Sequence, residues 1–182
     1  KPVIIGKWRA TTEPGYYYTK VKLLNPKGAF RIALGQQRAW SVGRHHNSHE
    51  ALVQSKPVTG YRDFDKNFER DNDSVDTGLF GINQHWGYDL QKVGKASAGC
   101  LVGQYKTEHR KFMSLVKSDI RYETDYRYTF FTTVLDGRAL FAVAGKNADI
   151  AHARRPVEGE LAFAEIGLEL AGHAVGHLRG RA

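Results

Sequence analysis

The segment 126–135 constrains the fold of this chain more strongly than any other. Its sequence, Tyr-Arg-Tyr-Thr-Phe-Phe-Thr-Thr-Val-Leu, consists almost entirely of the aromatic and β-branched residues that favour strands. Asp136-Gly137 follows as a turn pair, and 140–143 is a candidate returning strand. Aromatic residues make up 12% of the 182-residue chain, which extends the same tendency. We therefore expect a mainly β fold with a few short helices.

Turn signals at 14–15 and 25–28 divide the first part of the chain into short segments. One helix is predicted at 107–118, because Phe112, Leu115 and Val116 recur there at helical spacing. The strands predicted around these features span 16–24, 29–34, 39–42, 51–54, 58–61 and 79–85.

The segment 62–77 is dense in charged residues and predicts a long solvated loop. A calcium-binding loop is the alternative, because many of these residues are acidic. The spacing lacks the Gly at the sixth position and the Glu at the twelfth position of a helix–loop–helix calcium site. We therefore expect no metal and no cofactor in this chain.

The pattern changes to helical after residue 157. Apolar residues between 158 and 178 form a band, and Glu165 and Glu169 lie one helical turn apart on a polar face. Pro156 and the shift in composition place a boundary near residue 151. We expect one domain at 1–150, which holds every candidate site residue, and a C-terminal helical extension at 151–182.

The chain carries 27 Lys and Arg against 19 Asp and Glu, a net charge of +8. This favours a polyanionic setting such as nucleic acid, an anionic membrane or an anionic wall polymer. No run of five or six basic residues occurs, so we expect no nucleic-acid partner. Charges interrupt the apolar runs, so we expect no integral membrane segment. The chain starts at Lys1 without a leader, which says nothing about export.

The single cysteine, Cys100, excludes an internal disulfide and any multi-cysteine zinc site. It lies in a turn of small residues, fifteen residues after His85. An imidazole within reach of a thiol takes its proton and favours a reactive thiolate. Gly99 permits a tight backbone turn beside the sulfur, and Ser97 can form a hydrogen bond across that turn. Asn83, two residues before His85, or a backbone carbonyl can orient the imidazole.

The ordered pattern His85-x-Gly87, a loop, and Ser97-x-Gly99-Cys100 resembles the signature of L,D-transpeptidases, the YkuD-like cysteine enzymes of bacterial cell walls. The resemblance covers about 78–103. It implies a β-sandwich-like catalytic domain at 1–150 with a small helix behind the cysteine, and peptidoglycan stem peptides as substrate. It also implies Cys100 as the acylated nucleophile and His85 as the general base, with Ser97 and Gly99 shaping the oxyanion turn. We expect a monomer in a periplasmic or secreted location.

Two positions depart from that signature. Trp86 stands between His85 and the glycine, and Val102-Gly103 stands where the family continues with Arg. The missing cation removes an anchor for an acceptor peptide, whereas water needs no anchor. We therefore expect a cell-wall hydrolase of the L,D-peptidase type, with L,D-transpeptidation as the alternative. Another cation, such as Arg44 or Lys95, is able to take over the missing role.

Other functions remain open at this point. His45 and His49 would share a helix face and, with Glu50, would form a zinc site, although they lie in a strand-and-loop context. Arg44 and His46 are candidates for binding a substrate carboxylate. Trp86 and Tyr88 are candidates for stacking on sugar, either beside the catalytic pair or in a noncatalytic wall-binding module. The sequence does not distinguish remodelling of the cell's own wall from the action of a phage or effector lysin.

Overall fold

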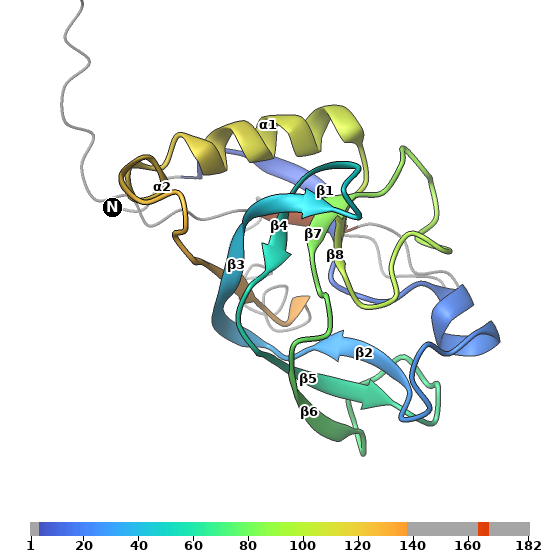
Figure 1. Ribbon diagram of the computed structural model, residues 1–182. Helices are drawn as coiled ribbons and strands as arrows, with labels where there is room; N and C mark the ends of the chain where they lie inside the picture. The colour runs from blue at the N-terminus through green and yellow to red at the C-terminus, as the bar shows by residue number, and fades with distance from the viewer. Residues whose placement is uncertain (1–3, 138–163, 168–182) are drawn as a thin grey trace, which may run out of the picture.

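The computed structural model describes residues 4–137 and 164–167, which form two curled β-sheets and a few short helices (Figure 1). This confirms the predicted mainly β class. The strands are β1 (Lys7–Thr11), β2 (Ala29–Ile32), β3 (Gly35–His45), β4 (His49–Gln54), β5 (Val58–Asp63), β6 (Ser74–Gly78), β7 (Gln84–Trp86), β8 (Leu101–Gly103), β9 (Phe130–Val134) and β10 (Ala164–Gly167). The helices are the π-helical turn η1 (Tyr17–Val21), α1 (Lys106–Lys117) and α2 (Ile120–Thr124).

The larger sheet has the strand order β10-β1-β8-β7-β4-β3-β9, and the smaller sheet has the order β2-β5-β6. All pairings are antiparallel except that of β7 with β8, which is parallel. The long strand β3 curves from β9 to its hairpin with β4, and its register with β9 shifts between Arg38 and Trp40. Such a shift sharpens the local twist and bends a strand.

A core of apolar side chains lies between the sheets and α1. Trp40 is completely buried at its centre, and its indole Nε1 donates a hydrogen bond to the carbonyl of Ile82 (2.7 Å). Helix α1 contacts β4, β7 and β8 and contributes Met113 and Val116 to this core (Figure 1). The helix predicted at 107–118 is therefore confirmed to within a residue at each end.

The strand predicted at 16–24 is wrong. The amides of Tyr18 and Thr19 both donate to the carbonyl of Gly15, and the Thr19 hydroxyl donates to the same oxygen (3.2 Å). These bonds wind the chain into η1, and Thr19 is fully buried inside the turn. The aromatic residues that suggested a strand therefore lie on a short helical turn.

The strands predicted at 29–34, 39–42, 51–54 and 58–61 are present as β2, β3, β4 and β5, with bounds that differ at one or both ends. Three further predicted segments differ more. The loop predicted at 62–77 is shorter in the structure, because β5 extends to Asp63 and β6 begins at Ser74. Of the strand predicted at 79–85, only Gln84 and His85 belong to a strand, β7. The amides of Phe80 and Ile82 donate to the side chain of Gln54 and not to the main chain of a neighbouring strand. In 126–135 the strand begins at Phe130, after a turn in which the Tyr128 amide donates to the Asp125 carbonyl (2.8 Å).

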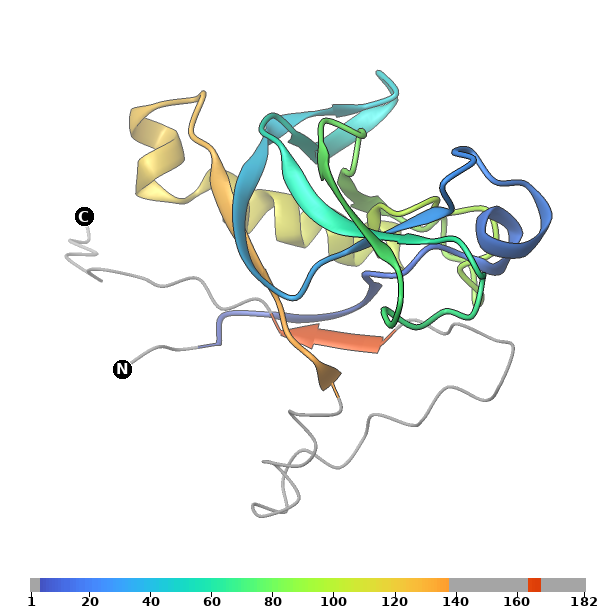
Figure 2. The ribbon, with the colours of Figure 1, turned by 90° about the horizontal axis from the view of Figure 1, so that it is seen from below.

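The C-terminal helix is wrong where the structure describes it. Ala164–Gly167 forms β10, which pairs antiparallel with β1 at the edge of the larger sheet (Figure 2). The open edge of β1 offers main-chain partners that override the helical pattern of the sequence. The rest of 158–178, the boundary near residue 151 and the strand at 140–143 lie outside the described residues. Within the described ranges, every helix is too short or too polar to cross a membrane.

Candidate active site

The parallel pairing of β7 with β8 brings the two halves of the predicted site together. Gln84 lies opposite Leu101 and His85 lies opposite Val102, and the Leu101 amide donates to the Asn83 carbonyl (2.9 Å). Because side chains alternate along a strand, His85 and Cys100 emerge on the same face of the sheet as diagonal neighbours.

Hydrogen bonds between the Ser97 hydroxyl and the main chain hold the turn before Cys100 in place. The Ser97 hydroxyl donates to the Cys100 carbonyl (2.8 Å) and accepts from the Gly99 amide (3.1 Å). Gly99 has φ +134°, and a Cβ atom there would lie 2.9 Å from the Phe30 carbonyl oxygen. Gly15 supports the turn from outside, because its amide donates to the Ser97 carbonyl (2.9 Å). The hydrogen bond expected from Ser97 across the turn is present.

The Cys100 thiol is half-buried against the apolar side chains of Val93, Ala96 and Val102. Its Sγ donates to the Gly81 carbonyl (3.5 Å). Burial raises the pKa of Cys100 above its ordinary value, and only a hydrogen bond at Asn83 opposes this rise. The resting cysteine is therefore a neutral thiol, and the preformed thiolate expected from the sequence is not favoured.

The His85 imidazole is almost completely buried, with 2% of its surface exposed. Its Nδ1 lies 2.8 Å from the Trp86 carbonyl oxygen, which can only accept, so Nδ1 carries the proton. The ring stacks on His45 with centroids 3.9 Å apart. Burial, and then the neighbouring His45, lower the pKa of His85 to about 3. The ring is therefore neutral at physiological pH, with Nε2 left as a lone-pair acceptor.

Asn83 does not orient His85. Its side-chain oxygen accepts from the Gln54 amide (2.9 Å), and its nitrogen lies 3.0 Å from His45 Nδ1. Orientation of the imidazole comes from the Trp86 carbonyl, the other possibility that the sequence left open. Within residues 4–137, no hydrogen bond joins Cys100 Sγ to His85.

His85 belongs to a group of four buried rings, called here the histidine cluster: His45, His49, His85 and His109. Burial lowers the pKa of all four, to about 4 for His45 and for His49. His109 comes from α1, and its Nε2 lies 2.9 Å from the Glu50 carbonyl oxygen. Sequence reasoning missed His109, because only the docking of α1 on β4 brings it to the site.

The zinc alternative does not match the structure. His45 and His49 face each other across the β3–β4 hairpin rather than along a helix, and the turn between them has positive φ at His46 and Asn47. Glu50 pairs instead with Lys117 (2.8 Å). In the described part of the chain, the only group of carboxylate, imidazole or thiol ligands spaced to hold a metal ion lies elsewhere.

The predicted substrate-binding residues have different surroundings. Arg44 Nη2 donates to the Ser48 carbonyl (2.8 Å) and so closes the hairpin turn, while His46 is exposed beside His45. Trp86 is half-buried and stacks on His49 with centroids 3.8 Å apart, so one face of its indole is covered. Tyr88 is 45% exposed and lies 6.5 Å from His85 between ring centroids. Of the two aromatics, Tyr88 is the better placed to meet a ligand.

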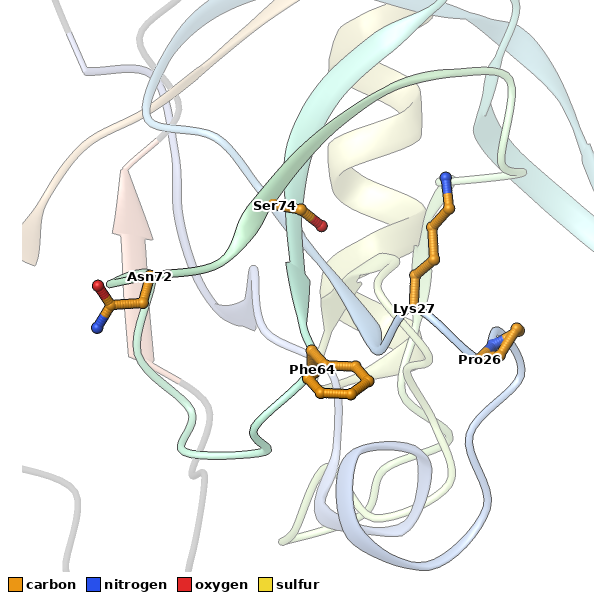
Figure 3. Close-up of a pocket in the computed structure, with 5 residues that line it drawn as sticks. All are labelled: Pro26, Lys27, Phe64, Asn72 and Ser74. Carbon is orange, nitrogen blue, oxygen red and sulfur yellow. The ribbon is translucent and has the colours of Figure 1, made fainter.

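A separate surface pocket of about 400 Å³ contains none of the predicted site residues. It lies between the turn before β2 and the β5–β6 loop, and Figure 3 shows the side chains that line it. These residues are Pro26, Lys27, Phe64, Asn72 and Ser74. We therefore place the candidate active site at the β7–β8 pair and not in this pocket.

The arrangement provides a thiol nucleophile in a fixed turn, a neutral imidazole with a free Nε2 on the same sheet face, and an exposed tyrosine beside them. A thiol and a neutral imidazole are residue types that cysteine acyl-transfer enzymes use, but in this structure they are not joined by a hydrogen bond. Comparison with known proteins adds no identity: no family model, no curated protein and no solved structure matches the chain.

Proposed function

We propose that this chain is a cysteine peptidase that cleaves peptidoglycan stem peptides through an acyl-enzyme on Cys100. The observation that carries the proposal is the parallel β7–β8 pairing, which sets His85 and Cys100 on one sheet face beside a turn fixed by Ser97 and Gly99. The substrate class and a β-sandwich-like catalytic domain come from the resemblance of this segment to L,D-transpeptidases. The net charge of +8 suits an anionic wall.

Attack and proton transfer occur together in this mechanism. Burial raises the pKa of Cys100 and lowers that of His85, so both shifts oppose a resting thiolate–imidazolium pair. The proposal therefore requires substrate binding to bring the Cys100 thiol within hydrogen-bond reach of His85 Nε2, so that the proton passes to Nε2 as Sγ bonds to the substrate carbonyl carbon. His85 then returns the proton to the leaving amine, and the peptide C–N bond breaks to leave a thioester.

The amide of Cys100 is the candidate oxyanion donor. The amides on either side are already engaged, Gly99 by the Ser97 hydroxyl (3.1 Å) and Leu101 by the Asn83 carbonyl (2.9 Å). A main-chain donor held rigidly at a turn stabilises the charge that develops on the carbonyl oxygen without reorganising. Ser97 and Gly99 therefore act as positioning residues for this donor.

Hydrolysis is the favoured fate of the thioester. Val102 replaces the arginine of the resembled family and is fully buried beside Val93 and Ala96. Two cations named above as replacements are held elsewhere: Arg44 at the hairpin turn, and Lys95 over the Tyr17 ring (4.4 Å). Water then attacks the thioester carbon with His85 as base, which releases the shortened peptide and restores the thiol.

The test supplies a tetrapeptide stem donor with an excess of an amine acceptor and measures both products by mass spectrometry. We expect mainly hydrolysed peptide from the wild-type chain and none from Cys100→Ala. A majority of cross-linked product would replace the hydrolase assignment with L,D-transpeptidation. If neither product forms while the protein still binds sacculi, the chain is a noncatalytic wall-binding module.

A further inference from the structure

The loop between β5 and β6 gathers three carboxylates at its two ends. Asp63 is the last residue of β5, Asp65 follows in the loop, and Asp73 immediately precedes β6. One carboxylate oxygen from each lies within 4.8 Å of those from the other two. The flanking residues Phe64, Asn72 and Ser74 appear in Figure 3, on the side of the loop that lines the surface pocket.

Two oxygens of this group are buried without a partner. Asp63 is fully buried: its Oδ2 accepts from the Phe68 amide (3.2 Å), while its Oδ1 has no hydrogen-bond partner among the described residues. Oδ2 of Asp73 is also buried and has no hydrogen-bond partner among the described residues. A buried carboxylate oxygen without a partner is strongly unfavourable. These oxygens therefore point to a ligand.

The charges of the surrounding ion pairs leave the group negative. Arg31 lies 3.8 Å from Asp63 but only 2.8 Å from Glu13, and Arg70 also pairs with Glu13. The guanidinium groups of Arg31 and Arg70 thus pair with Glu13 and Asp63, whereas Asp65 accepts hydrogen bonds from Asn67. Burial raises the pKa of Asp63 and of Asp73, and the charge of Asp63 raises that of Asp73 further. A divalent cation would neutralise this network.

We propose that Asp63, Asp65 and Asp73 bind a calcium ion that joins the two ends of the β5–β6 loop. Calcium takes oxygen ligands at about 2.3–2.6 Å, so ligands on opposite sides of the ion lie about 5 Å apart, and three oxygens within 4.8 Å of one another can share one ion. Magnesium demands near-ideal octahedral geometry and usually keeps several waters, whereas calcium accepts a more flexible set of carboxylate ligands. The ligands follow the ends of two strands rather than the positions of a helix–loop–helix site, so their spacing in the sequence did not predict this role.

The test titrates the metal-free full chain with CaCl₂ in a calorimeter, with MgCl₂ as a parallel titration. We expect one calcium ion per chain, a melting temperature that rises with calcium concentration, and slower tryptic cleavage after Lys66 and Arg70 in the loop. Cys100→Ala should bind calcium equally well, so this test is independent of the proposed catalysis.

Variants identify the ligands. Asp65→Asn and Asp73→Asn should each weaken calcium binding by at least about tenfold. Asp71→Asn is the matched control, because Asp71 lies in the same loop but outside the group of three, so binding should be unchanged. Circular dichroism of each calcium-free variant separates lost binding from lost folding. No saturable binding at millimolar calcium, equal binding by Asp73→Asn, or tighter binding of magnesium would overturn the proposal.

Discussion

The nucleophile and the base of this candidate site are positioned by different means. Cys100 follows a turn whose geometry is fixed by hydrogen bonds between the Ser97 hydroxyl and the main chain and by the positive φ of Gly99. His85 is held mainly by ring-on-ring contacts within the histidine cluster, with one bond to the main chain at Trp86. The thiol side is half-buried, and the imidazole side is almost completely buried.

This difference predicts that substitutions near Cys100 and substitutions near His85 should have different effects. A change in the turn moves the sulfur and its oxyanion donor, because the main chain has one conformation there. A change in the histidine cluster alters protonation and packing, because four neutral rings share one buried volume. Variants on the two sides should therefore be distinguishable by their dependence on pH.

The largest effect is expected at the nucleophile. Cys100→Ala should reduce hydrolysis of stem peptides to background, because no other thiol exists in the chain. The fold should persist, since the thiol makes only weak hydrogen bonds, among them the long one to Gly81 (3.5 Å). Product formation is measured by mass spectrometry, with a melting curve as control. Substantial turnover by a folded Cys100→Ala would remove the basis of the cysteine mechanism.

The next effect is expected at the base. His85→Gln keeps a polar side chain of similar length but no acid–base group, so kcat/KM should fall roughly a hundred- to ten-thousand-fold. Because the resting thiol is neutral, alkylation of Cys100 at neutral pH should be slow in both proteins and should accelerate as the pH rises. Fast alkylation of the wild type at pH 7 that the variant loses would instead reveal a preformed ion pair.

A smaller effect is expected in the turn. Gly99→Ala places a Cβ at φ +134°, 2.9 Å from the Phe30 carbonyl oxygen, so the free energy of unfolding should fall by about 1–3 kcal/mol. The turnover of the folded protein should fall as well. Gly103→Ala is the matched control, because the nearest atom to its Cβ is the His85 carbonyl oxygen at 3.8 Å. Equal stability of the two variants would mean that the turn is not rigid.

The smallest effect concerns the histidine cluster and pH. The pKa values of these histidines in the folded state lie below the ordinary 6.5, so below pH 6.5 the unfolded chain binds more protons than the folded chain. The free energy of unfolding therefore decreases as the pH falls from 6.5 toward 4. Each such histidine contributes about 1.4 kcal/mol per pH unit. His49→Phe keeps a ring on Trp86 and should reduce the slope by about one proton, as measured by urea unfolding between pH 5 and 7. An unchanged slope would show that His49 is not buried as a neutral ring.

Local chemistry in the sequence predicts the turn well. Ser97, Gly99 and Cys100 are close in the chain, and their types determine which hydrogen bonds and backbone angles are available. The mainly β class and the bounds of α1 follow from composition and periodicity for the same reason.

Contacts distant in the chain were not predictable in this way. The sequence offered Asn83 or a backbone carbonyl as the group that orients His85, but the Asn83 side chain bonds the Gln54 amide and lies 3.0 Å from His45 Nδ1. His109 enters the site only through the docking of α1, and Ala164–Gly167 became a strand only because β1 had an open edge. Each of these outcomes depends on tertiary partners rather than on neighbouring residues.

The most direct test of the central claim is the acyl-enzyme itself. The wild-type chain is mixed with a defined tetrapeptide muropeptide and quenched in acid within seconds, and intact-protein and peptide mass spectrometry follow. The account predicts a transient gain of the acyl fragment on the peptide that contains Cys100, no such gain in Cys100→Ala, and a longer-lived adduct in His85→Gln if any forms. Shortened muropeptide that accumulates without an adduct, and equally well in Cys100→Ala, would contradict it.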